Sequence, residues 1–385
     1  MAKMKTQPIR PIKVLHVVHW PVSGITSLLK SLIPLIAAEG VHNHIVFFYD
    51  DADTAADFSR LCESAQCIHL SKSYLRGILR YRRFIKSIAP DILHTHSFQP
   101  LVWGSLLARG RTRHITTVHS NYPYFTGRSL KARAKKTIEK LFLMRGCMRT
   151  VAVGKGVQAL LAGLGVSQRN LFLIENGVDI AGYGRDAGAR AEVRCELGIT
   201  DDQFAFVTLG RLDNATKAYD ILLRSFAPVC RQHGERALLV FIGDGPDRNK
   251  LIEMAEQLGI NGQIKFIGYR KNPAHYLGAG DAYVCSSVIE GFGLATAEAM
   301  LCGLPVVATR VGANPEMITN GVSGILIEPG DPAAISGAME DFLSGKYPLD
   351  EMARLGTLQV AGKYDIKKTA AAYVSLYRSV MGNST

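Results

Sequence analysis

The sequence of 385 residues lacks the features of several protein classes. No apolar run approaches the roughly 18 consecutive residues that a membrane-spanning helix needs, so we expect no spanning segment. The basic N-terminus leads into only a short apolar stretch, VLHVVHW, with no small-residue cleavage site behind it, which argues against a signal peptide. The seven cysteines are scattered and form no C-x-x-C pair, which predicts reduced thiols, no zinc site and a cytoplasmic protein.

A dinucleotide-binding loop is also missing. A nicotinamide-dependent oxidoreductase would carry G-x-G-x-x-G after its first strand, but the sequence there reads PVSGITSLL. This absence disfavours a dehydrogenase.

Acidic side chains are scarce in one long region. Between Arg76 and Arg149, sixteen Lys and Arg residues are accompanied only by Asp91 and Glu139. Such a field favours an anionic partner, for example phospholipid headgroups, a lipid diphosphate or nucleic acid; a solvated basic face without a ligand is the alternative. The region has no recognisable nucleic-acid reader motif and the second half of the chain is net acidic, so we expect no nucleic acid.

Short apolar runs recur along the chain, and each is followed by a helical pattern. Continuous rather than alternating apolar runs indicate parallel sheets that helices cover on both faces. Six runs in each half therefore predict an α/β protein with two doubly wound, Rossmann-like domains. The expected strands begin near Val14, His44, Asp91, His114, Thr150 and Leu171 in the first half, and near Phe204, Ala237, Ile264, Ala282, Leu304 and Gly324 in the second.

The domain boundary is expected where strand continuity is weakest. Residues 177–194 are rich in Gly, Ala and charge, so we place the linker there. The predicted domains are residues 1–185 and 186–364. Residues 365–385 read as a terminal helix with an apolar stripe that packs on a domain surface.

The stretch VIEGFGLATAEAMLCGLPVV contains two acids on either side of a glycine pair. Gly291 and Gly293 favour a turn that a ligand can approach closely, and a helix should begin near residues 294–296. Its free amides and positive dipole end suit a diphosphate. Glu290 and Glu298 can face different ends of one ligand, since a carboxylate can accept hydrogen bonds from both hydroxyls of a ribose. The alternative is that Glu298 only complements the helix dipole and Glu290 is solvated.

Other polar groups follow other strands. Arg211 and Lys217 lie in the loop after the Phe204 strand and together favour phosphate binding, although either cation alone is more often a surface residue. In the first half, Ser23 and Gly24 open a helical stretch, and His119 precedes a polar loop. We expect a pocket role for His119, whereas the strand-end residues His94 and His96 are better candidates for hydrogen-bonded core histidines.

These motifs resemble one family. EGFGLATAE, GRLDNATK, IGDGP, NGVD and DILHTH closely resemble the retaining GT-B glycosyltransferases of the large mannosyl- and glucosyltransferase family, and matches run from about residue 12 to the C-terminus. The resemblance implies two Rossmann-like domains facing across a cleft, with the acceptor in the first and a nucleotide-sugar in the second. It also implies that the terminal helix, residues 365–385, packs back on the first domain. It implies transfer of a hexose-type sugar from a UDP- or GDP-sugar with retention of configuration, no cofactor and no required metal.

The resemblance also implies individual roles. Glu298 would hold the ribose, Glu290 would lie at the donor sugar, and His119 would contact the sugar near the reacting carbon. The implied catalytic residues are His119, Glu290, Arg211 and Lys217. The implied donor-binding residues are Ser23, Gly24, Arg211, Lys217, Glu290, Gly291, Phe292, Gly293, Leu294, Ala295 and Glu298.

Three positions depart from the family pattern. Ser23 replaces the first of two paired glycines, and Ala218 replaces the glycine after the diphosphate lysine. The tract before Glu316 reads VGANPE instead of containing a double glycine.

The basic segment 128–142 bears on where the acceptor is found. The basic segment 128–142 has the apolar stripe Leu130, Ala134, Ile138, Leu141 and Phe142, which is either core-facing or a peripheral contact with anionic membrane. A membrane contact suits a glycan or lipid-linked acceptor in bacterial surface polysaccharide or lipopolysaccharide synthesis, at the inner face of the cytoplasmic membrane.

The main rival function is that of a nucleotide-sugar epimerase of related two-domain fold. A metal-dependent transferase using Asp51 and Asp53 is less favoured, because DDADTAAD reads as a solvated loop.

Overall fold

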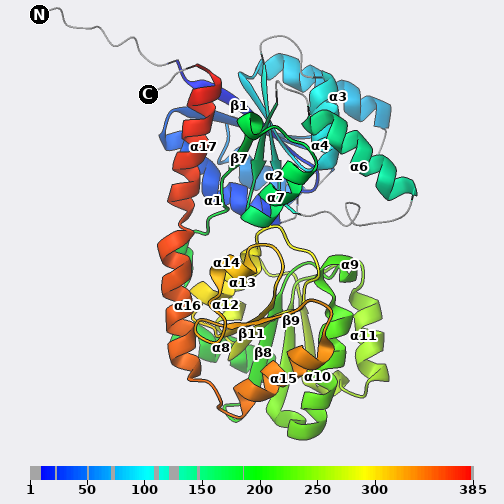
Figure 1. Ribbon diagram of the computed structural model, residues 1–385, viewed down its shortest axis with the longest axis vertical. Coiled ribbons are helices and arrows are strands. Elements are labelled where there is room, and N and C mark those ends of the chain that lie inside the picture. The colour runs from blue at the N-terminus through cyan, green and yellow to red at the C-terminus, as the bar shows by residue number, and fades with distance from the viewer. Residues whose placement is uncertain are drawn as a thin grey trace, which may run out of the picture.

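The computed structural model describes residues 10–21, 24–49, 52–70, 74–107, 112–120, 130–144, 148–184 and 186–382. These residues form two α/β lobes, one above the other in Figure 1. Each lobe has a parallel sheet with helices on both faces. None of the helices in the described segments is both long and apolar enough to cross a membrane.

The N-terminal lobe is built on a seven-stranded sheet of order β3-β2-β1-β4-β5-β6-β7. Its strands are β1 (Ile12–Val18), β2 (Val41–Phe47), β3 (Ser64–Cys67), β4 (Ile92–His96), β5 (Arg113–Val118), β6 (Met148–Ala152) and β7 (Leu171–Leu173). Its helices include α1 (Gly24–Ala38), α2 (Ala52–Ser59), α3 (Tyr74–Ile88), α4 (Phe98–Leu107), α6 (Leu130–Leu143) and α7 (Lys155–Gly163).

The C-terminal lobe is built on a six-stranded sheet of order β10-β9-β8-β11-β12-β13. Its strands are β8 (Phe204–Leu209), β9 (Ala237–Ile242), β10 (Ile264–Gly268), β11 (Ala282–Cys285), β12 (Val306–Thr309) and β13 (Ile325–Ile327). Its helices include α8 (Ala187–Leu197), α9 (Asn214–Lys217), α10 (Tyr219–His233), α11 (Arg248–Gln257), α12 (Pro273–Leu277), α13 (Leu294–Leu301), α14 (Asn314–Met317) and α15 (Pro332–Leu343). In both sheets the strand order reverses beside the first strand of the lobe, where ligands bind in open α/β sheets.

Two long helices connect the lobes along one side. Helix α16 (Leu349–Lys363) packs on α13, and α17 (Ile366–Val380) returns to the N-terminal lobe and packs on α1 (Figure 1). The apolar stripe of α17 is buried, with Tyr373 and Tyr377 almost inaccessible to solvent. Burying a row of large apolar side chains stabilises this return by several kcal/mol at roughly 1.5–3 kcal/mol for each side chain.

Two details of the fold differ from the sequence prediction. Six strands were expected in the first half, but the sheet has seven, because the edge strand β3 reads SAQC and carries no apolar run. The expected linker 177–194 also contains part of α8. Arg190 and Arg194 of this helix pair with Asp281, at 2.6 and 3.1 Å, and so fasten α8 to the C-terminal lobe.

Candidate active site

The glycine pair after β11 opens helix α13. Gly293 takes a φ of 94°, in the left-handed region that glycine adopts without strain, and the helix begins at Leu294. The amides of Thr296 and Ala297 donate to the Gly293 carbonyl, whereas those of Leu294 and Ala295 have no acceptor among the described residues. The first turn of α13 therefore offers free N–H groups at the positive end of the helix dipole.

A buried ion pair stands beside this turn. Lys217 Nζ lies 2.5 Å from Glu290 Oε1, and the two side chains are only 20% and 14% exposed. Burial disfavours the charged lysine, but Glu290 and its neighbours more than offset this and hold the pKa of Lys217 above its usual value. Ser287 Oγ donates to the same carboxylate oxygen at 2.9 Å. The structure thus brings two of the predicted site residues into direct contact.

Helix α9 and the loop after β11 are joined by their backbones. The Thr216 carbonyl accepts hydrogen bonds from the amides of Val288 and Ile289, and Ser286 Oγ donates to the Lys217 carbonyl at 2.8 Å. Ala218, which stands where the family has glycine, has a φ of 50°, so this position keeps the left-handed backbone that glycine would favour. Lys217 and Glu290 are therefore held together by their chains as well as by charge.

Arg211 is placed differently from Lys217. Its side chain is exposed and forms no ion pair with any described residue. It follows Gly210, over which the Lys217 side chain passes: a Cβ on Gly210 would lie 3.2 Å from Lys217 Cε. Arg211 is thus free to meet an anion near Lys217.

Glu298 faces the segment that joins the lobes. Tyr183, just after the short turn η2 (Ile180–Gly182), donates its hydroxyl to Glu298 Oε1 at 2.9 Å. Burial raises the pKa of Glu298 to about 7, although the Tyr183 hydrogen bond and Lys217 oppose the increase. The sequence prediction missed Tyr183, because nothing in its glycine-rich surroundings marks it as a site residue.

The lobes touch where the glycine pair meets the N-terminal lobe. A Cβ on Gly291 would overlap the carbonyl oxygen of His119, and one on Gly24 would lie 3.7 Å from a Leu294 methyl group. A Cβ on Gly154 would lie 3.5 Å from the carbonyl oxygen of Gly291. The predicted residues Gly24, His119 and Gly291 therefore meet at one junction.

The tract before Glu316 closes over the other side of the glycine pair. Gly312 has a φ of 58°, and a Cβ there would lie 2.7 Å from Glu290 Cβ. Asn314 is buried and donates from Nδ2 to the Thr309 carbonyl at 2.9 Å. Glu316 lies 3.7 Å from Lys155 of α7, an ion pair between the lobes. Gly312 thus allows the backbone of this tract to approach Glu290 closely.

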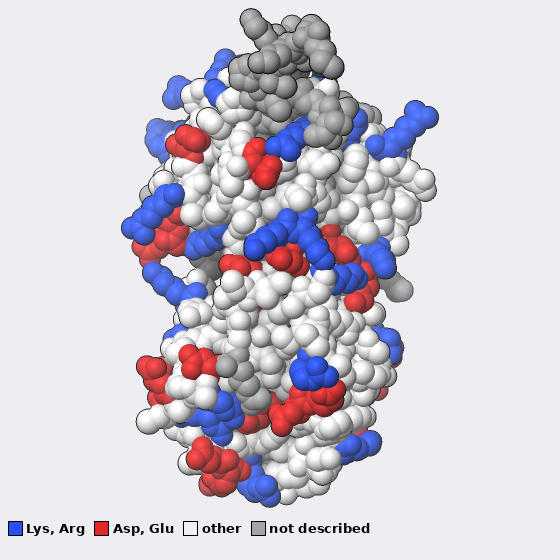
Figure 2. Space-filling view, turned by 90° about the vertical axis from the view of Figure 1, so that its left-hand side faces the viewer, with Lys and Arg blue, Asp and Glu red and all other residues white. Residues whose placement is uncertain are grey.

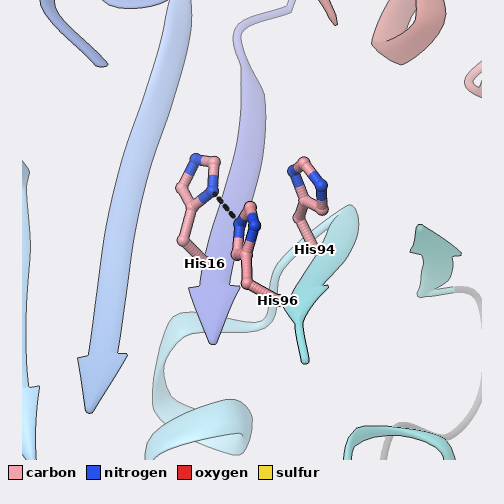
Figure 3. Close-up of side chains that lie close together, drawn as sticks. All are labelled: His16, His94 and His96. Atoms are coloured by element: carbon pink, nitrogen blue, oxygen red, sulfur yellow. Dashed lines mark hydrogen bonds between the residues drawn. The ribbon is translucent and has the colours of Figure 1, made fainter. Parts of the chain in front are cut away.

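Four histidines gather at the carboxyl edge of the N-terminal sheet. His16, His94 and His96 offer ring nitrogens within 4.8 Å of one another, a spacing that could suit a metal ion. Every ring nitrogen of the three is already hydrogen-bonded: His16 to Asn43 and His96, His96 to His119, and His94 to Thr117 and Tyr377. Figure 3 shows His16 and His96 joined by a hydrogen bond while His94 stands apart from that line. The cluster is therefore explained as a hydrogen-bonded core.

Three residues named in the sequence prediction make none of the contacts described above. Ser23 and Asp51 lie outside the residues that the structure describes, so their predicted roles remain predictions. Asp53 is exposed in the first turn of α2 and not in a loop, because the segment after it is helical.

The basic segment 128–142 does not turn its apolar stripe inward as a whole. Leu130, Ile138 and Leu141 of α6 are 83%, 40% and 64% exposed, while Phe142 packs against the core. Tyr74, Leu75 and Leu79 of α3, beyond α4, are also exposed. By contrast, the opposite side of the molecule, which carries α16 and α17, shows basic and acidic side chains interspersed (Figure 2).

Known proteins resemble this chain over nearly its whole length. The family model described as "Glycosyltransferase Family 4" matches residues 22–181, and "Glycosyl transferases group 1" matches residues 189–357. Among curated relatives, an N-acetyl-alpha-D-glucosaminyl L-malate synthase of Bacillus anthracis is 25% identical and aligns with 95% of this chain and 90% of its own. A D-inositol 3-phosphate glycosyltransferase of Catenulispora acidiphila is 28% identical over 76% of this chain and 72% of its own.

Solved structures agree in fold. Anabaena HepE in complex with UDP-glucose superposes with a TM-score of 0.84 at 19% identity, covering 96% of this chain and all of the other. WaaG, a glycosyltransferase involved in lipopolysaccharide biosynthesis, superposes with a TM-score of 0.75 at 15% identity, covering 95% of this chain and 99% of its own. Both show that the two lobes are arranged as in the GT-B fold.

Proposed function

The chain belongs to the group 1 glycosyltransferases of GT-B fold, and from that premise we propose that it moves a hexose-type sugar from a UDP- or GDP-sugar to an acceptor hydroxyl. The observation that carries the proposal is the buried Lys217–Glu290 pair beside the free amides of Leu294 and Ala295. A cation and an open helix N-terminus at one point suit the diphosphate of a nucleotide-sugar. UDP is the first nucleotide to test, since HepE was solved with UDP and UDP-glucose.

The reaction breaks the bond between the sugar and the diphosphate. As this bond breaks, negative charge grows on the leaving phosphate, and Lys217, Arg211 and the amides of α13 stabilise it in the transition state. Glu290 holds Lys217 in place and lies at the donor sugar, and Glu298 accepts hydrogen bonds from the ribose hydroxyls. These cations and amides supply the charge stabilisation without a metal ion, so full turnover should persist after treatment with EDTA.

We propose that the anomeric configuration is retained. The acceptor hydroxyl attacks from the face that the diphosphate leaves, and a leaving-phosphate oxygen takes its proton. Glu290 is held by Lys217 and Ser287, which fits a structural role better than that of a covalent nucleophile. Proton NMR of freshly formed product tests this, because an inverted anomeric coupling would exclude front-face transfer.

The acceptor is proposed to bind at the N-terminal lobe. Trp20, at the carboxyl end of β1, is 45% exposed and stacks on Tyr49 with ring centroids 4.1 Å apart, an apolar platform suited to a sugar ring. A glycan or lipid-linked acceptor, as in surface polysaccharide or lipopolysaccharide synthesis, fits such a platform. A small hydroxyl acceptor is the second candidate, because two relatives are named for L-malate and D-inositol 3-phosphate.

A membrane contact is proposed for the face formed by α3 and α6. Leu75 and Leu130 are 71% and 83% exposed, and Arg76, Arg80 and Lys140 flank such apolar side chains. Exposed leucines among basic residues on helices are typical of peripheral binding to anionic lipid. Sedimentation with vesicles of phosphatidylglycerol and phosphatidylcholine at low salt tests it, and failure to sediment with the anionic vesicles would contradict it.

Donor and reaction type can be tested together. A thermal-shift panel of UDP-, GDP- and ADP-sugars should single out one donor, because a ligand at about 100 times its dissociation constant adds roughly 2.7 kcal/mol of stability. That donor should then be consumed only when an acceptor is supplied, apart from slow hydrolysis. If the sugar isomerises without acceptor, the epimerase alternative is correct instead.

A further inference from the structure

An unbroken chain of four polar side chains crosses the N-terminal sheet and ends at the lobe junction. Asn43 Oδ1 lies 3.2 Å from His16 Nε2, His16 Nδ1 lies 3.3 Å from His96 Nε2, and His96 Nδ1 lies 3.0 Å from His119 Nε2. The four residues come from β2, β1, β4 and the end of β5, which are neighbours in the sheet. The central link is visible in Figure 3.

The direction of the chain is fixed at its inner end. Asn43 is 2% exposed, and its Nδ2 donates to the Val41 carbonyl at 3.0 Å. A carbonyl oxygen only accepts, so the amide nitrogen of Asn43 must face it and Oδ1 must face His16. His16 Nε2 therefore carries the hydrogen.

Each further link follows from the first, because a neutral imidazole has one N–H and one lone pair. Burial lowers the pKa of His16 to about 4 and that of His119 to about 3, and it lowers the pKa of His96 well below its usual value. His16 Nδ1 is then an acceptor for His96 Nε2–H, and His96 Nδ1 is an acceptor for His119 Nε2–H. The outer nitrogen, His119 Nδ1, is left as a lone pair with no partner among the described residues.

We propose that Asn43, His16 and His96 are positioning residues that hold His119 as a hydrogen-bond acceptor for a hydroxyl of the donor sugar. His119 is at the right place for this, since its carbonyl packs on Gly291 beside the Lys217–Glu290 pair. The proposal rests on the proposed function. It also sets specificity: a sugar that offers a hydroxyl to His119 is favoured, whereas one with an ionised carboxylate there has no hydrogen to donate and meets a lone pair.

His94 provides a matched control inside the same cluster. It is as buried as His16 and its ring lies 5.3 Å from that of His16, but it bonds to Tyr377 and Thr117 at 2.8 and 2.7 Å. It therefore ties α17 to the sheet and takes no part in the chain. Replacing either histidine removes a buried imidazole, yet only the loss of His16 interrupts the route to His119.

The direct test is the tautomer of His119 in the full-length protein labelled with ¹⁵N-histidine. Long-range ¹H–¹⁵N NMR should show that Nε2 of His119 carries the hydrogen and that Nδ1 does not. The His119 signals are assigned by their absence from the spectrum of His119→Phe. In His16→Phe, His96 loses its acceptor and is free to reverse, so the Nδ1–H form of His119 should appear. His94→Phe should lower the unfolding temperature without changing this tautomer. A wild-type His119 with Nδ1–H overturns the proposal even if His16→Phe does not fold.

Steady-state kinetics distinguish a role of His16 in positioning His119 from a role in protein stability alone. His16→Phe should raise the KM for the nucleotide-sugar about ten-fold, the value of one hydrogen bond, while the affinity for free UDP stays unchanged. An equal rise in His94→Phe would overturn the proposal, and so would stoichiometric Zn²⁺ binding that shifts the His16 and His96 signals. If no nucleotide-sugar is turned over but the tautomers respond as described, the proposed function is wrong. The hydrogen-bond series from Asn43 to His119 is then still supported.

Discussion

The two lobes present opposite chemistry at facing edges of their sheets. The C-terminal edge offers the charged Lys217–Glu290 pair and the free amides at the start of α13. The N-terminal edge offers neutral hydrogen-bonding groups, since burial keeps His16, His96 and His119 uncharged. We infer a division of labour in which one lobe binds the diphosphate and ribose and the other orients the sugar.

The net charge of each half of the chain would instead have assigned diphosphate binding to the N-terminal lobe. The first 190 residues hold 27 Lys and Arg against 11 Asp and Glu, while the remainder holds 18 against 22. The cations proposed for the diphosphate nevertheless lie in the lobe with the net negative charge. Net charge describes how a surface meets other large surfaces, whereas a small anion is bound by a few groups in fixed positions.

The largest expected effect comes from removing the cation of the C-terminal lobe. Lys217→Ala should lower turnover roughly 10²–10³-fold, because a preorganised group that meets the leaving charge is lost. Steady-state kinetics with the best donor measure this. Lys250→Ala, at an 80% exposed lysine of the same lobe, should be near wild type. Turnover within a few-fold of wild type in Lys217→Ala would break the charge assignment.

The next effect tests the contact between the lobes. In Gly291→Ala the new Cβ overlaps the His119 carbonyl, so the lobes must separate slightly. A misplacement of about 1 Å can cost roughly 10²-fold in rate, so turnover should fall by about that factor while UDP affinity changes little. Gly262→Ala, where a Cβ meets nothing within 4 Å, is the matched control. Weaker UDP binding in Gly291→Ala would instead assign the glycine to the nucleotide.

A smaller effect concerns pH. Because the pKa of Glu298 is raised to about 7 in the folded protein from 4.5, the folded state binds its proton more tightly. The resulting stabilisation is complete below about pH 4.5 and is lost as the pH rises through about 7. Urea unfolding should therefore show that the free energy of unfolding of wild type falls relative to that of Glu298→Gln as the pH rises across this range.

The same carboxyl group should control ribose binding in the opposite direction. An ionised Glu298 accepts hydrogen bonds at both oxygens, so UDP affinity should rise from pH 6 to pH 8 in wild type. Calorimetric titrations in buffers of equal ionic strength measure this. A Glu298→Gln variant with the same pH dependence would show that another group is responsible.

The smallest effect on activity is expected on the α3 and α6 face. Leu130→Ser combined with Leu141→Ser should weaken the affinity for anionic vesicles by roughly 10²-fold or more, since each leucine buried in the membrane contributes on the order of 1.5–3 kcal/mol to binding. Stability should change by no more than about 0.5 kcal/mol, as is usual for exposed positions. Val322→Ser, at a 49% exposed residue of the other lobe, should leave vesicle binding intact.

The C-terminal edge was largely predictable from sequence and the N-terminal edge was not. Residues 290–298 are contiguous, so the glycine pair, the helix start at Leu294 and the nearby acids could be read locally. Asn43, His16 and His96 meet only through strand order, and the two histidines are 80 positions apart in the sequence. Tyr183 reaches Glu298 across 115 residues. Such contacts depend on tertiary register, which a local pattern does not contain.

The division of labour is tested most directly by the thermal shift that UDP produces in three proteins. UDP carries the ribose and diphosphate but no sugar, so it should stabilise wild type and His119→Ala alike and should stabilise Lys217→Ala much less. His119→Ala keeps the backbone carbonyl that packs on Gly291, so the lobe contact is preserved. If the shift persists in Lys217→Ala, or disappears in His119→Ala, the assignment of nucleotide binding to the C-terminal lobe is contradicted.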